Sequence, residues 1–272
     1  MSVTIGLVIA FLGFLVASGI TARAIFSSTR SDSTPRLSFA VIAIFAQLFT
    51  VTHLLLDTAV EASHMQFSLA AMSLLVNVLI CTVLTLRSIQ STNLMLLLVT
   101  YVFSGLLSVG LLLVPISSSI FSGVVVNSSL PLFIHIILSM AAYCVLVIAS
   151  LYALQFRYID AKLKAKTLKL NSHLPALTSV ESQQFRLMTI GVFLLTLSLA
   201  TGFTFLDNMF SKEFAHKTIL SMLAWFMFVV LTLGHKHYGW RGNNSAIATV
   251  IASIVLTLAY FGSRFVREIL LN

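Results

Sequence analysis

The segment 131-PLFIHIILSMAAYCVLVIASLYAL-154 is long and apolar enough to cross a lipid bilayer as one α-helix. It carries no charged residue, but it holds a histidine near its start, followed at spacings of four by a serine and a tyrosine: His135, Ser139 and Tyr143. Residues four apart repeat along one face of a helix, so these three form a narrow polar line. Such a line has to face protein, water or a ligand, because lipid offers no hydrogen-bond partner.

The whole chain has the composition of an integral membrane protein. Of its 272 residues, 58% are hydrophobic and only 9% are charged, whereas soluble domains carry roughly 25% charged residues. The mean hydropathy is +1.03. Cys81 and Cys144 lie in apolar runs without a CxxC motif, so neither a disulfide framework nor a dithiol redox site is indicated. The net charge of +8 is better explained by loop charges that orient the chain than by a nucleic-acid partner.

Eight segments qualify as membrane spans, and none contains an internal Asp, Glu, Lys or Arg: 2–22, 37–56, 66–86, 94–114, 131–156, 187–206, 218–234 and 245–263. We therefore expect an all-α, polytopic membrane protein in which residues 1–272 form a single transmembrane domain. The first basic residues follow the first apolar run instead of preceding it, which favours an uncleaved span over a signal peptide.

The basic residues predict the orientation in the bilayer. If the N-terminus lies outside, twelve of the sixteen Lys and Arg residues fall inside: Arg23, Arg30, Arg36, Arg87, Arg157, Lys162, Lys164, Lys166, Lys169, Arg186, Lys236 and Arg241. The other four then lie outside: Lys212, Lys217, Arg264 and Arg267. The positive-inside rule favours this arrangement, with both termini outside. The basic link 157–186 is expected to be a cytoplasmic loop that signals topology, and a lipid- or partner-binding patch is the alternative.

In that orientation, four of the seven histidines lie in one outer layer: His53, His64, His135 and His216. Neutral imidazole costs less to bury than a charged group, and it can ligate haem iron or a transition metal. His53 and His135 lie about 6 Å inside their helices, where a functional role is the default interpretation. His64 and His216 lie at or beyond helix ends, where headgroups and water satisfy histidines; this is the favoured interpretation for His64, whereas a functional role is weighed equally for His216.

Two residues are placed to orient these imidazoles. Asp57 follows His53 by one helical turn, and Ser139 stands in the same relation to His135. The other histidines have plainer interpretations. His235 and His237, in LGHKHYGWRG, flank a capped helix end and a Gly-rich turn, and His173 is expected to be solvated in the long inner loop.

Four segments, in this order, resemble the cytochrome c assembly (CcsA-like) family, in its small YpjD/HemX-like inner-membrane branch: PLFIHIILSMAAYCVLVIASLYAL, HLPALTSVESQQFRLMTIGVFLLTLSLATG, HKTILSMLAWFMFVVLTLGHKHYGWRG and AYFGSRFVREILL. The resemblance covers about residues 131 to 265, and the first four spans agree with the family in hydropathy only. It implies about eight spanning helices that handle haem, with outward-facing histidines as haem ligands. His135 falls on the first outward family histidine, His216 on the outer approach to the following helix, and His235 on the histidine that ends that helix before GWRG.

The chain departs from the family in one segment. Assembly factors that pass haem to apocytochrome c carry a Trp-rich outer segment, whereas this chain has LDNMFSKEFAHK there and only Trp225 and Trp240 elsewhere. The resemblance therefore supports haem binding or sensing more than it supports haem transfer to an apocytochrome.

The leading hypothesis is a haem-binding inner-membrane protein that acts in haem handling or cytochrome assembly. Two histidines from different helices would ligate the iron, most plausibly His135 with His216 or His53, and the porphyrin edge would contact residues such as Phe133 and Phe214.

Two alternatives come from other classes of protein. A transporter affecting divalent metal ions is less favoured, because ion-coupled carriers usually place Asp or Glu within their spans. A HemX-like non-catalytic regulator or scaffold would use the basic residues between Lys162 and Lys169 as its contact surface. An enzyme is least favoured, since the sequence has no nucleophile–base pair, paired carboxylates, phosphate-binding glycine loop or HExxH motif.

Overall fold

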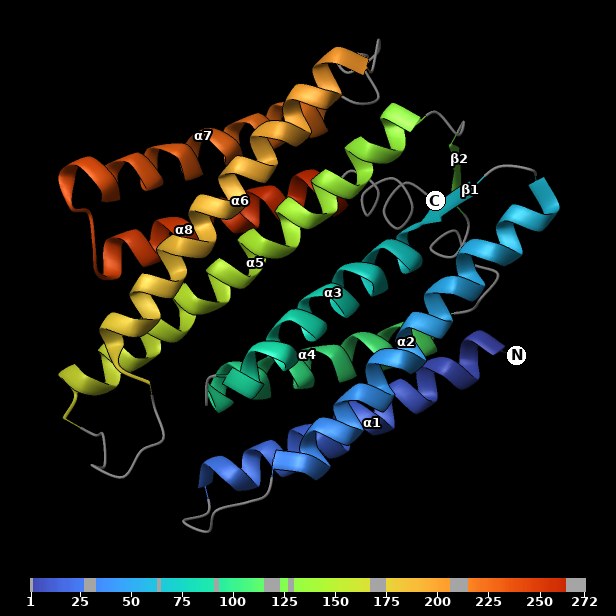
Figure 1. The fold of residues 1–272 in the computed structure, drawn as a ribbon, viewed down its shortest axis with the longest axis horizontal. Helices are drawn as coiled ribbons and strands as arrows, with labels where there is room; N and C mark the ends of the chain where they lie inside the picture. The colour runs from blue at the N-terminus through green and yellow to red at the C-terminus, as the bar shows by residue number, and fades with distance from the viewer. Residues whose placement is uncertain are drawn as a thin grey trace. The chain divides into compact units, whose positions relative to one another are not determined.

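The computed structural model describes residues 2–26, 33–62, 65–90, 93–114, 123–126, 130–166, 175–205 and 215–262. Eight helices in these ranges are long and apolar enough to cross a membrane, which confirms the expected all-α, polytopic class. The helices are α1 Ser2–Phe26, α2 Ser33–Ala62, α3 Leu69–Gln90, α4 Leu94–Leu113, α5 Leu130–Lys164, α6 Leu177–Phe205, α7 Ala215–Tyr238 and α8 Asn243–Thr257 (Figure 1). A π-helical turn, η1 Leu258–Gly262, continues α8, and two short strands are β1 Met65–Ser68 and β2 Gly123–Val126.

The chain folds as two compact units, each with four of the long helices. Unit 1 comprises residues 1–127 and 171–174, and unit 2 comprises residues 128–170 and 175–272. Each unit has its own internal packing, and the expectation of one transmembrane domain stays a prediction.

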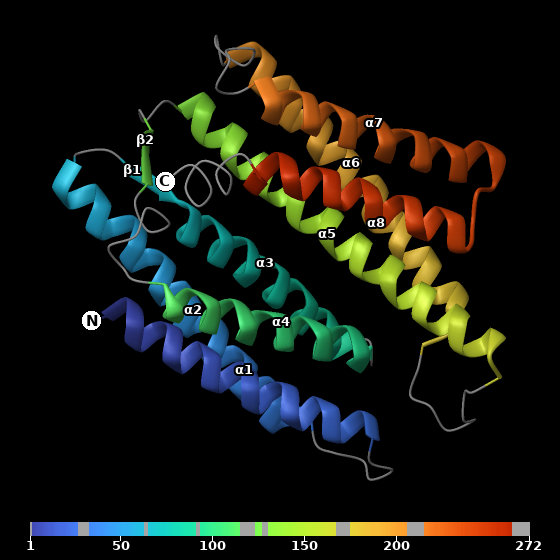
Figure 2. The same cartoon turned by 180° about the vertical axis from the view of Figure 1, so that it is seen from behind.

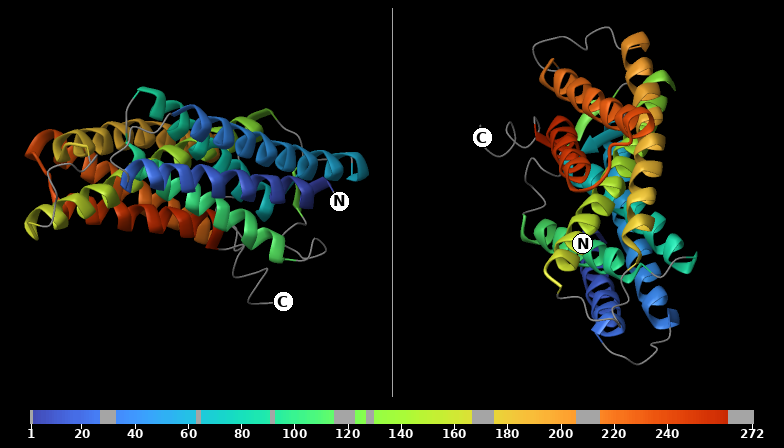
Figure 3. Two further views of the ribbon diagram at one scale, coloured as in Figure 1. Left: turned by 90° about the horizontal axis from the view of Figure 1, so that it is seen from below. Right: turned by 90° about the vertical axis from the view of Figure 1, so that its left-hand side faces the viewer.

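In unit 1, α1 packs against α2 and α4, and Figure 3 shows α1 and α2 side by side. The buried face of α1 has small residues at spacings of three or four: Gly6, Ala10, Gly13 and Ala17. A Cβ atom on Gly13 would lie 2.8 Å from the Cβ of Ala43, and a Cβ on Gly6 would overlap the hydroxyl of Thr50. Because lipid provides no hydrophobic force between helices, this close backbone approach contributes the packing energy.

A closed hydrogen-bond network joins α2, α3 and α4 inside unit 1. The Nε2 of Gln47 donates to Ser108 Oγ at 3.1 Å, and its Oε1 accepts from Asn77 Nδ2 at 2.9 Å. Ser104 Oγ donates to Asn77 Oδ1 at 2.9 Å and contacts the sulfur of Cys81 at the same distance. All five side chains are buried. Polar groups within membrane spans must satisfy one another, and these do so without a ligand.

Strands β1 and β2 form a short antiparallel ribbon in unit 1, with Met65 opposite Val126 and Ser68 opposite Gly123. This ribbon was not predicted from the sequence. The hydroxyl of Ser68 accepts the N–H of Ala71 at 3.1 Å and so caps the first turn of α3. As a result, α3 begins at Leu69 and not at the expected residue 66.

In unit 2, α5 and α6 run side by side along most of their length, as Figures 2 and 3 show. Helix α8 packs on α5 and α7, and α7 also packs on α6. Gly191 of α6 allows the close approach of α5, because a Cβ there would lie 2.6 Å from Leu146 Cγ. The largest buried apolar side chains of the unit come from all four helices: Leu146, Ile148, Met188, Leu195, Phe228 and Leu256.

Helices α5 and α6 extend far into the basic link that the sequence analysis placed at 157–186. Helix α5 continues to Lys164 and α6 begins at Leu177, while residues 167–174, with His173, lie outside the described ranges. Lys164 Nζ donates to Asp160 at 2.7 Å, an i,i+4 pair that supports the last turns of α5. Hydropathy reports only the part of a helix that lies in lipid, whereas the backbone remains helical beyond it.

Candidate functional site around His135

His135 lies near the start of α5, and its side chain is half-buried. The ring Nδ1 is 2.9 Å from the backbone oxygen of Ser198 in α6 and 3.3 Å from Thr201 Oγ1. Because a carbonyl oxygen can only accept, Nδ1 carries the proton and donates it. The bond therefore fixes both the ring orientation and the tautomer, with the lone pair on Nε2.

The Nε2 atom of His135 has a single polar contact in the part of the chain that the structure describes, with Ser139 Oγ at 3.4 Å. The same hydroxyl lies much closer to Ser198 Oγ, at 2.5 Å. Hydroxyl hydrogen bonds are ordinarily shorter than 3.4 Å, so Ser139 engages Ser198 more strongly than it engages the imidazole. Nε2 consequently keeps a lone pair that is largely unused.

Tyr143 completes the polar line, and it contacts α8 and η1. Its hydroxyl is 3.1 Å from Thr257 Oγ1, and its ring centroid is 4.9 Å from that of Tyr260. The hydroxyl of Tyr260 donates to the backbone oxygen of Ser139 at 2.8 Å. The line formed by His135, Ser139 and Tyr143 thus faces other helices of unit 2, which answers the requirement that it avoid lipid.

His53 lies in α2 of unit 1, with its Nδ1 3.4 Å from Ser2 Oγ and its ring edge-on to Phe49 at a centroid distance of 4.7 Å. Asp57 is one turn further along α2, but its side chain lies outside the described residues. Its predicted role in orienting His53 stays a prediction. His53 belongs to unit 1 and His135 belongs to unit 2, so the predicted outer layer of histidines is divided between the two units.

His216 is the second residue of α7, and its side chain lies outside what the structure describes, as do His64 and Phe214. The predicted pairing of His135 with His216 therefore stays a prediction. Phe133, expected against a porphyrin edge, is an exposed residue of α5, with 47% of its surface accessible.

His235 is far from His135, so the structure does not bring these two predicted ligands together. Its ring stacks on Phe185 of α6 at a centroid distance of 3.6 Å, and its Nδ1 donates to Trp240 O at 2.9 Å. Phe185 and Ser198 are separated by about 20 Å along α6, given a rise of about 1.5 Å per residue. The two histidines therefore contact opposite ends of that helix.

The turn after α7 explains how the GWRG sequence holds His235. Gly239 and Gly242 have positive φ values of 65° and 82°, a backbone conformation that other residues rarely adopt. The N–H of Trp240 returns to the carbonyl of Gly234 at 3.2 Å, and the indole covers that glycine so closely that a Cβ would overlap it.

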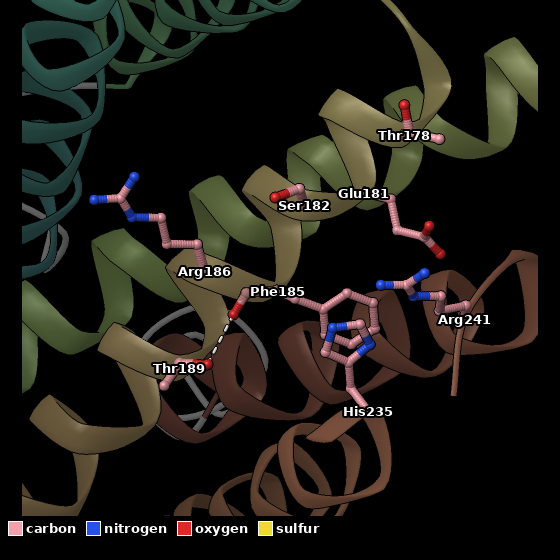
Figure 4. A pocket seen from close by; sticks show the side chains of 8 residues that line it. All are labelled: Thr178, Glu181, Ser182, Phe185, Arg186, Thr189, His235 and Arg241. Atoms are coloured by element: carbon pink, nitrogen blue, oxygen red, sulfur yellow. Dashed lines mark hydrogen bonds between the residues drawn. The ribbon is translucent and has the colours of Figure 1, made fainter. Parts of the chain in front are cut away.

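A hollow of about 280 Å³ lies beside His235, lined by α6 and by the turn between α7 and α8 (Figure 4). Arg186 and Arg241 line it, and Figure 4 shows them on opposite sides of the stacked rings of Phe185 and His235. Glu181 also lines it, and its Oε1 accepts the N–H of Gly242 at 2.8 Å, directly before α8.

The partners of His135 in α6 and the hollow beside His235 were not predicted from the sequence. The signal for the first was the pair of hydroxyl residues, Ser198 and Thr201, one turn apart in an otherwise apolar span. The signal for the second was a polar stripe with spacings of four at the start of α6: Thr178, Ser182 and Arg186. Among the described residues, no three His, Cys, Asp or Glu side chains form a group that could hold a metal ion.

Comparison with known proteins identifies the family of the chain. The family profile described as "Cytochrome C assembly protein" matches residues 65–271, which include α3 to α8. The "Inner membrane protein YpjD" of Escherichia coli (strain K12) is 39% identical over 208 residues, covering 76% of this chain and 78% of that protein. An "Uncharacterized 28.8 kDa protein in nifR3-like 5'region" of Azospirillum brasilense is 33% identical over 142 residues, covering 51% of this chain and 52% of that protein. No solved structure matches the chain significantly.

These findings agree with the resemblance drawn from residues 131 to 265 and extend it to residue 65. Eight helices able to cross a membrane, together with an inner membrane relative, make this a multi-pass inner membrane protein. The chain belongs to the cytochrome c assembly protein family.

Proposed function

We propose that this family member is a haem-binding membrane protein that acts in haem handling or cytochrome assembly, with His135 as an iron ligand. The observation that carries the proposal is the geometry of His135. Its Nδ1 is held by the carbonyl of Ser198, and its Nε2 has no close partner in the described part of the chain. Metal-ligating histidines commonly donate one ring N–H to a carbonyl, which orients the other nitrogen toward the metal.

The residues around His135 fit such a group. Haem, when bound, supplies an iron that takes imidazole nitrogen as an axial ligand. Ser198 would hold the ring, and Ser139 would leave Nε2 accessible because its hydroxyl engages Ser198. His216 is our candidate for the second ligand, since it belongs to the same unit. We leave His235 out of this pair, because its ring stacks on Phe185, toward the other end of α6 from Ser198.

The test is the absorbance spectrum of the detergent-purified full chain from haem-replete cells. We expect a Soret band that is lost in His135→Ala and weakened in His216→Ala, with His53→Ala tested beside them. His237→Ala is the matched control, because that histidine is exposed at the end of α7. A folded, monodisperse preparation without Soret absorbance, or an equal loss in His237→Ala, would contradict the proposal.

We also propose that both termini lie on the periplasmic side, which the excess of basic residues in the alternate links supports. Cys81 and Cys144 are buried, so a new surface cysteine can be labelled against a low background. Lys166→Cys is expected to react with a membrane-impermeant maleimide only after the cells are opened, and Lys212→Cys in intact cells. Labelling of Lys166→Cys in intact cells would reverse the orientation.

A further inference from the structure

The hollow beside His235 lies at the level where the spans of unit 2 leave the hydrocarbon. Arg186 directly precedes the uncharged run 187–205 of α6, and His235 directly follows the uncharged run 218–234 of α7. Residues at such boundaries meet the headgroups of the lipid bilayer. A ligand in this hollow would therefore lie at the depth of lipid phosphate groups.

The lining of the hollow is suited to an anion. Arg186 and Arg241 both line it, and neither guanidinium is paired with a carboxylate among the residues that the structure describes. The carboxylate of Glu181 instead accepts the N–H of Gly242 and caps the start of α8. The two arginines thus line the hollow without a carboxylate partner, while Glu181 keeps its negative charge and offsets part of theirs.

Hydroxyl groups extend the same surface. Thr178 and Ser182 precede Arg186 at spacings of four, so all three lie on one face of α6 and line the hollow. Hydroxyl and guanidinium donors together match the acceptor oxygens of phosphate, which arginine binds in a bidentate manner. The volume of about 280 Å³ is at the small end of ligand pockets, so it suits a headgroup better than a larger molecule.

We propose that this hollow binds the phosphate group of an anionic ligand, which the positive charges of Arg186 and Arg241 attract from opposite sides of the stacked rings of Phe185 and His235. Basic pockets between membrane helices bind anionic lipid headgroups, which makes an anionic phospholipid the expected source. A soluble phosphate ester offers the same chemistry and is the other source. The site is separate from His135 and does not depend on haem binding there.

The first arm of the test measures lipid preference. The full chain is reconstituted in nanodiscs of equal parts phosphatidylcholine and phosphatidylglycerol, and the lipids it retains on release are counted by native mass spectrometry. We expect phosphatidylglycerol to be enriched at least about tenfold, and the enrichment to be lost in the double variant Arg186→Gln with Arg241→Gln. The matched control, Lys166→Gln with Lys236→Gln, removes the same charge from exposed residues outside the hollow and should keep the enrichment.

The second arm distinguishes a free ligand from a lipid. In the Trp225→Phe background, Trp240 is the only tryptophan and reports from beside the hollow. Inorganic phosphate is titrated into protein in pure phosphatidylcholine nanodiscs while Trp240 fluorescence is followed. Lipid enrichment without a phosphate response supports the lipid source, and a phosphate response abolished by the arginine variants supports the soluble source.

Two results would overturn the proposal: neither lipid enrichment nor a phosphate response in the unmodified chain, or an equal loss in the lysine control. If the double arginine variant fails to fold, Arg241→Gln alone serves, because this exposed side chain lies in the turn before α8. The single variant is expected to lose several-fold of the enrichment, and full retention would contradict the proposal.

Discussion

One buried polar cluster in each unit finds its hydrogen-bond partners in a different way. In unit 1, Gln47, Asn77 and Ser104 donate to and accept from one another and their neighbours, so the amide groups form a closed network. In unit 2, His135 is held by a backbone carbonyl, and in the described part of the chain its Nε2 has only a hydroxyl at 3.4 Å.

This difference separates a structural role from a functional one. A network in which every amide nitrogen and oxygen has a hydrogen-bond partner is stable in lipid without any ligand, and it specifies how the helices pack. Packing alone does not explain an imidazole whose ring is oriented by one nitrogen while the other nitrogen has no close partner among the described residues. We therefore assign the network of unit 1 to stability and the polar line of unit 2 to the proposed haem site.

The largest effect on stability is expected from Asn77→Leu, which removes the centre of the closed network. The substitution leaves Gln47 Oε1 without its donor and Ser104 without its acceptor on Asn77, at a cost of about 2 kcal/mol in the free energy of unfolding. Denaturant unfolding in detergent, followed by circular dichroism, measures this change. The haem content per folded protein should remain unchanged.

Thr82→Ala is the matched control in the same helix, because the hydroxyl of Thr82 donates only to Val78 O within α3. Its effect should stay below about 0.5 kcal/mol. If Asn77→Leu abolished the Soret band as completely as His135→Ala, the assignment of separate roles to the two units would be wrong.

The number and class of the helices were predictable from sequence, whereas their ends and the ribbon were not. Helix α4 spans Leu94–Leu113 against a predicted 94–114, because its apolar run is bounded by Asn93 and Pro115. Helix α5 continues eight residues past the predicted end, since charged residues leave the lipid without ending the helix. The pairing of β1 with β2 joins segments almost sixty residues apart, and no local pattern encodes such a contact.

The candidate site was predictable only in part for the same reason. The spacing of His135, Ser139 and Tyr143 on one helix predicted a shared face, because helical geometry is local. The partners of that face, Ser198 and Tyr260, depend on which helices pack together. His235 was a predicted ligand only because of the family resemblance. Its ring stacks on Phe185, which lies toward the opposite end of α6 from Ser198, the contact of His135.

A smaller effect is expected from Ser139→Ala, which tests whether the carbonyl of Ser198 orients His135 without help from the Ser139 hydroxyl. The variant loses the hydroxyl contact with Ser198 Oγ, at a cost of about 1 kcal/mol in the free energy of unfolding. The carbonyl of Ser198 that orients His135 remains, so the Soret band should persist. The spectrum and the denaturation midpoint of the purified variant are compared with those of His135→Ala. Complete loss of the band in Ser139→Ala would show that the hydroxyl, and not the carbonyl, orients the ring.

The smallest effect is expected from Tyr260→Phe. The hydroxyl of Tyr260 donates to the backbone oxygen of Ser139, and this oxygen also belongs to the hydrogen-bonded backbone of α5, so it is not left without a partner. The phenylalanine ring of the variant keeps the contact with Tyr143. Side-chain hydrogen bonds in membranes contribute about 0.6 kcal/mol on average, so we expect a loss of that size and an unchanged haem spectrum. Tyr158→Phe, at an exposed position of α5, controls for loss of a phenol and should have no measurable effect. A loss in Tyr260→Phe as large as that in Asn77→Leu would mean that the polar line of unit 2 is as closed a network as that of unit 1, and the distinction between them would fail.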